Sequence, residues 1–114
     1  MIKFEKGTMN AESVRGDSIS FSVRPKDKTT GQHLLKDGDE LFFSIKKNTG
    51  DVSLIEKVIN TFINGYGDIF ISPEETEKLE ADTYLYSLVA KRKDGNVDTL
   101  TPGPTAYLNI KERL

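Results

Sequence analysis

The stretch from Ile69 to Tyr86 reads IFISPEETEKLEADTYLY, and it contains the signals of a strand, a capped helical turn and a second strand. Alternating apolar residues before Ser72 predict the first strand. Ser72, Pro73 and Glu75 match an N-cap, a first-turn proline and a capping-box acid. Apolar residues then return at every second position. A helical turn at about residues 73 to 79 therefore carries the chain between two strands, as in an antiparallel β-sandwich.

Alternation of apolar and polar residues predicts most of the other strands. An earlier strand is expected within residues 2 to 14, with either Ile2 and Phe4 or Met9 and Val14 as its apolar positions. The remaining expected strands are residues 18 to 24, 40 to 47, 52 to 63 and 84 to 92, and a return strand from 97 to 110. With the strand before Ser72, this gives about seven to eight strands.

Residues 52 to 63 fit two structures. A helical stripe is present, and Ser53 with Glu56 could form a capping box. The many β-branched residues and the expected hairpin turn at residues 48 to 51 favour a strand. The apolar residues that a helix would align are Leu54, Ile55, Val58, Ile59 and Phe62.

Two segments interrupt the strands. Residues 25 to 39 are rich in turn formers and predict a long loop, in which Leu34 and Leu35 could plug one end of the core. Residues 101 to 104 read TPGP, and two prolines cannot donate to a strand ladder. The final strand is therefore expected to be bulged or to change sheets at that point.

Composition predicts one domain over residues 1 to 114. The chain has 36% hydrophobic and 30% charged residues, which is enough apolar material for one core. Its net charge of −2 favours neither a nucleic acid nor a membrane as partner. Cysteine is absent, so the fold rests on packing rather than disulfides. The N-terminus lacks the apolar core of a signal peptide, so we expect synthesis in the cytoplasm.

No catalytic, cofactor or metal motif appears in the sequence. His33 is the only histidine and lies in a polar loop. Asp37, Asp39 and Glu40 surround Gly38, but their spacing does not match a calcium loop, so a solvated turn is the favoured interpretation. Acids around the helical turn are explained by the helix dipole. Phosphate loops, zinc signatures and dinucleotide fingerprints are also missing. We therefore expect a protein that is not an enzyme and has no cofactor.

Three further features have a functional and a structural interpretation. The tripeptide from Arg15 to Asp17 is an integrin-recognition sequence, but a simple turn before a strand explains it as well. Tyr84 and Tyr86 share parity with the core positions that follow, so they are expected to face inward, as in a tyrosine corner. Tyr66 and Tyr107 could either face a sugar or line the sheets, and this choice stays open.

Several segments together resemble a family of phage proteins. They are Gly16-Asp17 before the 18 to 24 strand, the Leu41-Phe43-Ile45 alternation, the Ile-Ser-Pro-Glu-Glu-Thr segment from Ile71 with Leu79, and Tyr84-x-Tyr86-x-Leu88. Over roughly residues 14 to 110 the chain resembles the immunoglobulin-like β-sandwich at the start of baseplate upper proteins of tailed phages. One departure is Ala81-Asp82-Thr83, where such proteins often have a glycine before the first tyrosine.

The resemblance implies a structural or assembly role in a phage or prophage particle, in a tail, baseplate or head accessory module. The implied partners are other virion structural proteins, and a homo-oligomer is one form that such contacts could take. The chain ends shortly after the last expected strand, which suggests a free-standing module associated with the virion. The alternative is a carbohydrate- or cell-surface-binding module that uses Tyr66, Tyr107 or the 25 to 39 loop.

Overall fold

The computed structural model describes residues 3–4, 9–26, 30–32, 34–48, 52–100 and 106–113, which form nine strands and one short helix. The strands are β1 (Lys3–Phe4), β2 (Ala11–Val14), β3 (Ile19–Val23), β4 (Glu40–Lys46), β5 (Ile55–Ile59), β6 (Gly67–Ile71), β7 (Asp82–Lys91), β8 (Val97–Thr99) and β9 (Ala106–Lys111). The helix α1 is Pro73–Glu77. The all-β fold class expected from the sequence is confirmed.

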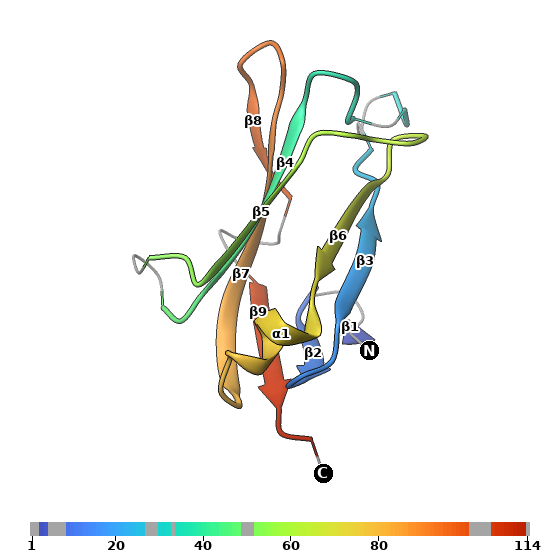
Figure 1. The fold of residues 1–114 in the computed structure, drawn as a ribbon. Helices are drawn as coiled ribbons and strands as arrows, with labels where there is room; N and C mark the ends of the chain where they lie inside the picture. The colour runs from blue at the N-terminus through green and yellow to red at the C-terminus, as the bar shows by residue number, and fades with distance from the viewer. Residues whose placement is uncertain are drawn as a thin grey trace.

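Two sheets of unequal size pack against each other (Figure 1). The large sheet has the strand order β1-β2-β9-β7-β4-β5, and β8 pairs with the C-terminal end of β7. The small sheet consists of β3 and β6. Helix α1 lies at one end, where the chain crosses from the small sheet to the large one (Figure 1).

The distribution of strands between the sheets is that of an immunoglobulin-like sandwich. Strands β3 and β6 take the places of strands B and E, and β4, β7 and β9 those of C, F and G. Strand β5 lies beside β4, as the additional C′ strand of a variable-type domain does. Strand β2 runs parallel to β9, which departs from the purely antiparallel sandwich expected from the sequence. All other strand pairs in the described residues are antiparallel.

The core lies between the sheets and is built from alternate residues of the facing strands. Phe43 of β4 is 2% exposed and meets the ring of Phe21 edge-on, with 5.8 Å between the ring centroids. Leu35 is 1% exposed, so the long loop does plug the core as expected. The other nearly inaccessible apolar side chains are Ile19, Leu41, Ile45, Ile69, Ile71, Leu88, Ala90, Leu108 and Ile110.

Helix α1 begins with the predicted capping box. The Ser72 hydroxyl oxygen accepts from the Glu75 amide at 3.2 Å, and the Glu75 carboxylate accepts from the Ser72 amide at 3.1 Å. Thr76 is fully buried, and its hydroxyl donates to the Asp17 carbonyl at 2.7 Å. The helix is thereby tied to the turn between β2 and β3.

The chain leaves α1 through a tyrosine corner. Tyr84 donates its hydroxyl proton to the Glu80 carbonyl at 2.8 Å, four residues upstream. Tyr86 donates to the Met9 carbonyl. The two tyrosines are 5% and 2% exposed, so the prediction that both face the core is confirmed. The corner forms with Ala81-Asp82-Thr83, and no glycine, before the first tyrosine.

The ambiguous segment is a strand where it faces β4. Residues Ile55–Ile59 form β5, in antiparallel register with β4, so the strand interpretation is confirmed and the helical one is wrong. The strand is shorter than expected, since residues after Ile59 leave the sheet. Residues 49–51 of the expected hairpin turn lie outside the described part of the chain.

The structure corrects two expectations at the ends of the chain. Ala11 and Ser13 are the buried positions of β2, whereas Val14, an apolar position in one of the two expected patterns, lies on the other face. The Ser13 hydroxyl has no hydrogen-bond partner among the described residues. Strands β8 and β9 both pair with β7, so the last strand does not change sheets. The expected bulge at 101 to 104 lies outside the described residues.

No described helix is long and apolar enough to span a membrane.

Candidate functional site

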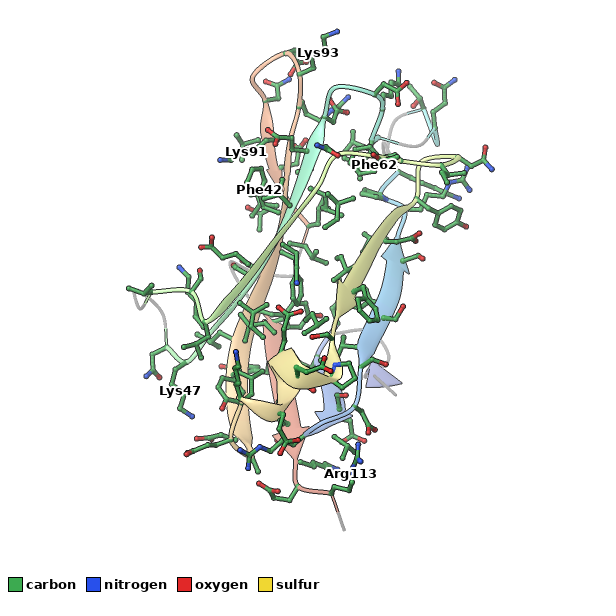
Figure 2. The ribbon with its side chains drawn as sticks, viewed as in Figure 1. Phe42, Lys47, Phe62, Lys91, Lys93 and Arg113 are labelled. Atoms are coloured by element: carbon green, nitrogen blue, oxygen red, sulfur yellow. The ribbon has the colours of Figure 1, made fainter. Side chains whose placement is uncertain are left out.

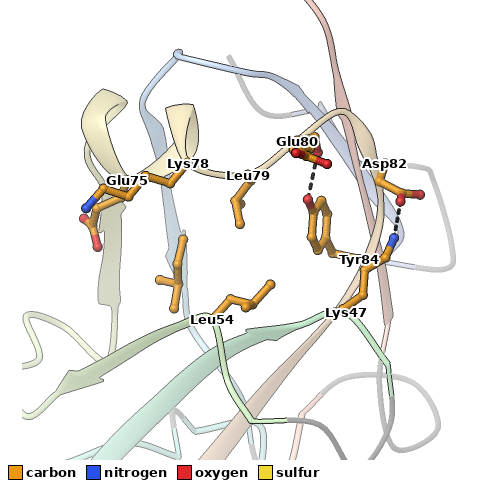
Figure 3. Close-up of a pocket in the computed structure, with 9 residues that line it drawn as sticks. Lys47, Leu54, Glu75, Lys78, Leu79, Glu80, Asp82 and Tyr84 are labelled. Atoms are coloured by element: carbon orange, nitrogen blue, oxygen red, sulfur yellow. Dashed lines mark hydrogen bonds and ion pairs between the residues drawn. The ribbon is translucent and has the colours of Figure 1, made fainter.

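A cleft of about 510 Å³ opens between the β4–β5 hairpin and the segment that joins α1 to β7 (Figure 3). Its lining is apolar in the middle and charged at the rim. The apolar residues are Leu54, Ile55, Leu79 and Tyr84, and the charged ones are Lys47, Glu75, Lys78, Glu80 and Asp82. The cleft has the size of a small-ligand or side-chain site.

Leu54 is the accessible apolar residue of the cleft. It is 54% exposed, whereas Leu79 on the opposite wall is 4% exposed. Figure 3 shows both side chains pointing into the space between α1 and the hairpin. The Leu54 amide donates to the Ile45 carbonyl at 2.8 Å, which fixes this residue at the start of β5. The cleft can therefore bury an apolar group between two leucines.

An ion pair closes one side of the cleft. The Lys47 ammonium binds the Asp82 carboxylate and lies 5.1 Å from the centroid of the Tyr84 ring (Figure 3). The hydrogen bond from Lys47 lowers the pKa of Asp82 below its ordinary value. Burial raises the pKa of Tyr84, whose hydroxyl is used in the corner hydrogen bond. Tyr84 therefore presents its aromatic ring to the cleft, because its hydroxyl proton is already donated to the Glu80 carbonyl.

A second ion pair spans from β5 to α1. Lys57 contacts the Glu75 carboxylate at 2.8 Å, and this hydrogen bond is the main reason that the pKa of Glu75 is lowered. The same carboxylate accepts from the Ser72 amide in the capping box. Glu75 therefore holds the first turn of the helix and connects it to the large sheet.

A second candidate surface is the outer face of the large sheet, which we define as Phe42, Val58, Val89, Val97 and Lys91. Phe42 lies between Val58 and Val89 in the strand register, and Lys91 lies opposite Val97. Val58 and Val97 are 53% and 59% exposed. The Lys91 ammonium lies 4.4 Å from the Phe42 ring centroid, and Figure 2 shows both side chains on the side away from β3 and β6. An apolar row crossed by one cation is thus open to a partner.

The structure separates the residues considered for a sugar site. Tyr66 precedes β6 and is 45% exposed, and the Arg24 guanidinium covers one face of its ring at 5.2 Å. Tyr107 lies on β9 in the large sheet and is 55% exposed. The loop of residues 25 to 39 contributes Leu35 to the core, and its residues 27–29 and His33 lie outside the described residues.

The turn before β4 contains a buried carboxylate, which corrects the expectation of a solvated turn. Asp39 is 4% exposed. Its side chain accepts from the Lys93 amide at 2.8 Å, the Lys36 amide at 2.9 Å and Arg92 Nε at 3.2 Å. Burial acts to raise the pKa of Asp39, but these donors outweigh it and the pKa is lowered. Asp39 ties the long loop to the β7–β8 hairpin. Aspartate before a strand gives no sequence signal for this role.

The Arg15 to Asp17 tripeptide is a packed turn. Gly16 has a φ of 84°, a region that favours glycine, and an added Cβ would lie 2.5 Å from a Glu77 carboxylate oxygen. Arg15 Nε donates to the Glu77 carbonyl at 2.8 Å, and Arg113 binds Asp17. The Arg15 contact holds the turn against α1 and the Arg113 contact holds it to the C-terminal segment, and both support the structural interpretation.

No group of three or more histidine, cysteine or acidic side chains within the described ranges could hold a metal ion. The carboxylates that the sequence clusters around α1 are distributed by the fold. Glu75 and Asp82 are in ion pairs, and Glu77 lies 4.0 Å from Arg15. The cleft therefore carries its charge at the rim.

Comparison with known proteins assigns the chain to no family. No family model matches the chain, and no curated protein matches it. Among solved structures, one of murine CRIg aligns with a TM-score of 0.44 and 8% sequence identity, over 100% of this chain and 98% of that one. The strand order and the tyrosine corner of the chain itself define its immunoglobulin-like sandwich.

Proposed function

We propose that this protein is a non-enzymatic structural module of a phage or prophage particle, which docks on other virion proteins. Two kinds of observation support this role. One is the resemblance of the segments around Ser72 and Tyr84 to baseplate upper proteins. The other, which carries the proposal, is the apolar outer face of the large sheet.

The outer face has the properties of a protein-binding surface. Exposed apolar residues that occur singly need no explanation, but Phe42, Val58 and Val89 form one row across three neighbouring strands. The ring of Phe42 is half-buried, and the methylene groups of Lys91 extend the apolar area beside it. A partner that covers this row removes apolar surface from water, which favours association.

The carbohydrate alternative has weaker support. A sugar platform needs an open aromatic face, and Arg24 occupies one face of the Tyr66 ring. Tyr107 lies on the other sheet, in register with Leu85. The two exposed tyrosines thus do not form a common platform, and Tyr107 fits better as an addition to the protein-binding surface.

Incorporation into particles tests the proposal. A tagged copy is expressed in the bacterium that encodes the chain, particles are induced and banded by density, and the bands are probed for the tag. We expect the tagged protein in the particle band. The variant Val58→Asp should be lost from it, because a charge then faces the partner in the outer face.

The matched control is Val52→Asp, which changes another valine, 87% exposed, that does not belong to the outer face. This variant should be incorporated like the unchanged protein. Absence of the unchanged protein from all particle bands would refute the virion role, and equal incorporation of both variants would refute the outer face as the docking surface.

A further inference from the structure

The outer edge of β5 is open beside the cleft. Strand β5 pairs with β4 on one edge, and no described residue pairs with its other edge. An edge strand leaves the N–H and C=O groups of every second residue free to bind another strand. Proteins recognise extended peptides in this way, with the main chain giving affinity and a neighbouring pocket giving specificity.

The cleft supplies such a pocket at the start of β5. Leu54 and Ile55 line it, and no residue of β6 does, although β6 also has an edge that no described residue pairs with. Side chains of a strand added to β5 would alternate between the two faces of the large sheet. An inward side chain near Ile55 would enter the space between Leu54 and Leu79 (Figure 3).

The rim of the cleft defines the charges of the guest. Lys78 and Glu80 flank Leu79, and both line the cleft. Neither side chain has an ion-pair partner among the described residues, in contrast to Lys47 and Glu75. A guest with an acidic and a basic group on the two sides of an apolar side chain would complement both.

We propose that the cleft and the open edge of β5 together bind an extended peptide segment of a partner protein. The segment pairs with β5, places one apolar side chain between Leu54 and Leu79, and presents one acidic and one basic side chain to Lys78 and Glu80. This site uses the free edge of β5 and the cleft, whereas the outer face uses only Val58 of that strand. The inference goes beyond the role proposed above and does not depend on it.

Two synthetic peptides test the proposal. Both are acetylated and amidated heptapeptides with threonine at positions 1, 3, 5 and 7. Leucine lies in the centre, and glutamate and lysine lie on the same side of the strand, two residues before and after it, in either order. Titration into the ¹⁵N-labelled protein should shift amide signals of residues 54–59 and 79–84. One peptide should bind more tightly. When it pairs with β5 in the favoured direction, its glutamate meets Lys78 and its lysine meets Glu80, whereas the other peptide brings like charges together.

Two variants decide whether the site is the one proposed. Leu54→Ser should weaken binding of the preferred peptide about tenfold, since it removes one wall of the pocket. Its control, Val97→Ser, changes an equally exposed apolar residue and should leave the affinity unchanged. The double change Lys78→Glu and Glu80→Lys should reverse which peptide binds better. Thermal melts of each variant check that it is folded.

The proposal fails if neither peptide shifts the cleft signals, or if the shifts fall on β6 or on the outer-face residues of β4, β7 and β8 instead. It also fails if Leu54→Ser and Val97→Ser bind alike, or if the double change leaves the peptide preference unaltered. The Val97→Asp variant, which changes the outer face away from β5, should lose particle incorporation and bind the peptides normally. A loss of particle incorporation with intact peptide binding would thus separate the two sites.

Discussion

The two faces of the large sheet carry similar residues with different roles. Phe43 and Phe42 are neighbours on β4, but Phe43 is 2% exposed in the core and Phe42 is half-buried on the outer face. Phe43 meets Phe21 and Tyr86, whereas Phe42 meets the Lys91 ammonium. Apolar residues on the inner face are thus explained by stability, and those on the outer face are not. We therefore explain the apolar row on the outer face by binding to a partner.

The pair of phenylalanines gives the largest contrast. Phe43→Ala should lower the free energy of unfolding by about 3–5 kcal/mol, because it removes a buried ring and leaves a cavity. Phe42→Ala should cost about 1 kcal/mol, since the ring is already partly in water. Urea denaturation of both variants measures the difference. Equal losses would show that the outer face contributes to the fold as much as the core does.

Asp39 extends the comparison to a polar group. Asp39→Ala should cost about 1–3 kcal/mol in urea denaturation, because two backbone amides and Arg92 then lose a buried acceptor. Asp37→Ala, in the same turn but exposed, should change stability by less than about 0.5 kcal/mol. If neither substitution changed the free energy of unfolding, Asp39 would have no structural role.

The pH dependence of stability offers a further check of Asp39. The pKa of Asp39 is lower in the folded protein than in the unfolded chain, where it is about 3.9. Its stabilising contribution is therefore complete above the unfolded pKa and is lost as the pH falls through the folded one. Asp39→Asn should flatten the loss of stability below about pH 4. An unchanged acid profile would contradict this role.

Tyr84 sharpens the comparison within one residue. Tyr84→Phe keeps the buried ring and removes the hydrogen bond to the Glu80 carbonyl, so we expect a loss of about 1 kcal/mol in thermal or urea unfolding. The variant should still show the cleft signals in NMR spectra. A loss comparable with that of Phe43→Ala would mean that the corner, rather than ring packing, determines stability at this end.

The smallest effect is expected at the rim of the cleft. Lys47→Gln removes the ion pair with Asp82. The side chains of both residues are about half exposed. The free energy of unfolding should change little at moderate salt, because an exposed ion pair is screened by solvent and ions. Denaturation with and without added sodium chloride measures this. A larger loss of unfolding free energy would show that the ion pair stabilises the fold and does not merely line the rim of the cleft.

Local signals made much of the fold predictable from the sequence. Ser72 and Glu75 specify a helix start by their own spacing, and the alternation in β4 and β7 specifies which residues are buried. Helical periodicity in residues 52 to 63 competed with β-branched content, and pairing with β4 decided for the strand. The sequence of a single segment does not specify tertiary contacts of this kind.

The candidate surfaces were not predictable in the same way. The cleft combines Lys47, Leu54 and Leu79 from segments that the sandwich topology brings together. The outer row depends on the register of three strands, and a shift of one residue would turn each strand's side chains to the other face. The burial of Asp39 depends on the hairpin that donates the Lys93 amide. Such features need the assembled fold.

The most direct test of the central claim is the incorporation of Val58→Asp and Val52→Asp into particles, compared with the unchanged protein. If the outer face is the docking surface of a virion module, the unchanged protein and Val52→Asp band with the particles and Val58→Asp does not. Equal banding of the three folded proteins, or absence of all three from the particles, would contradict the account.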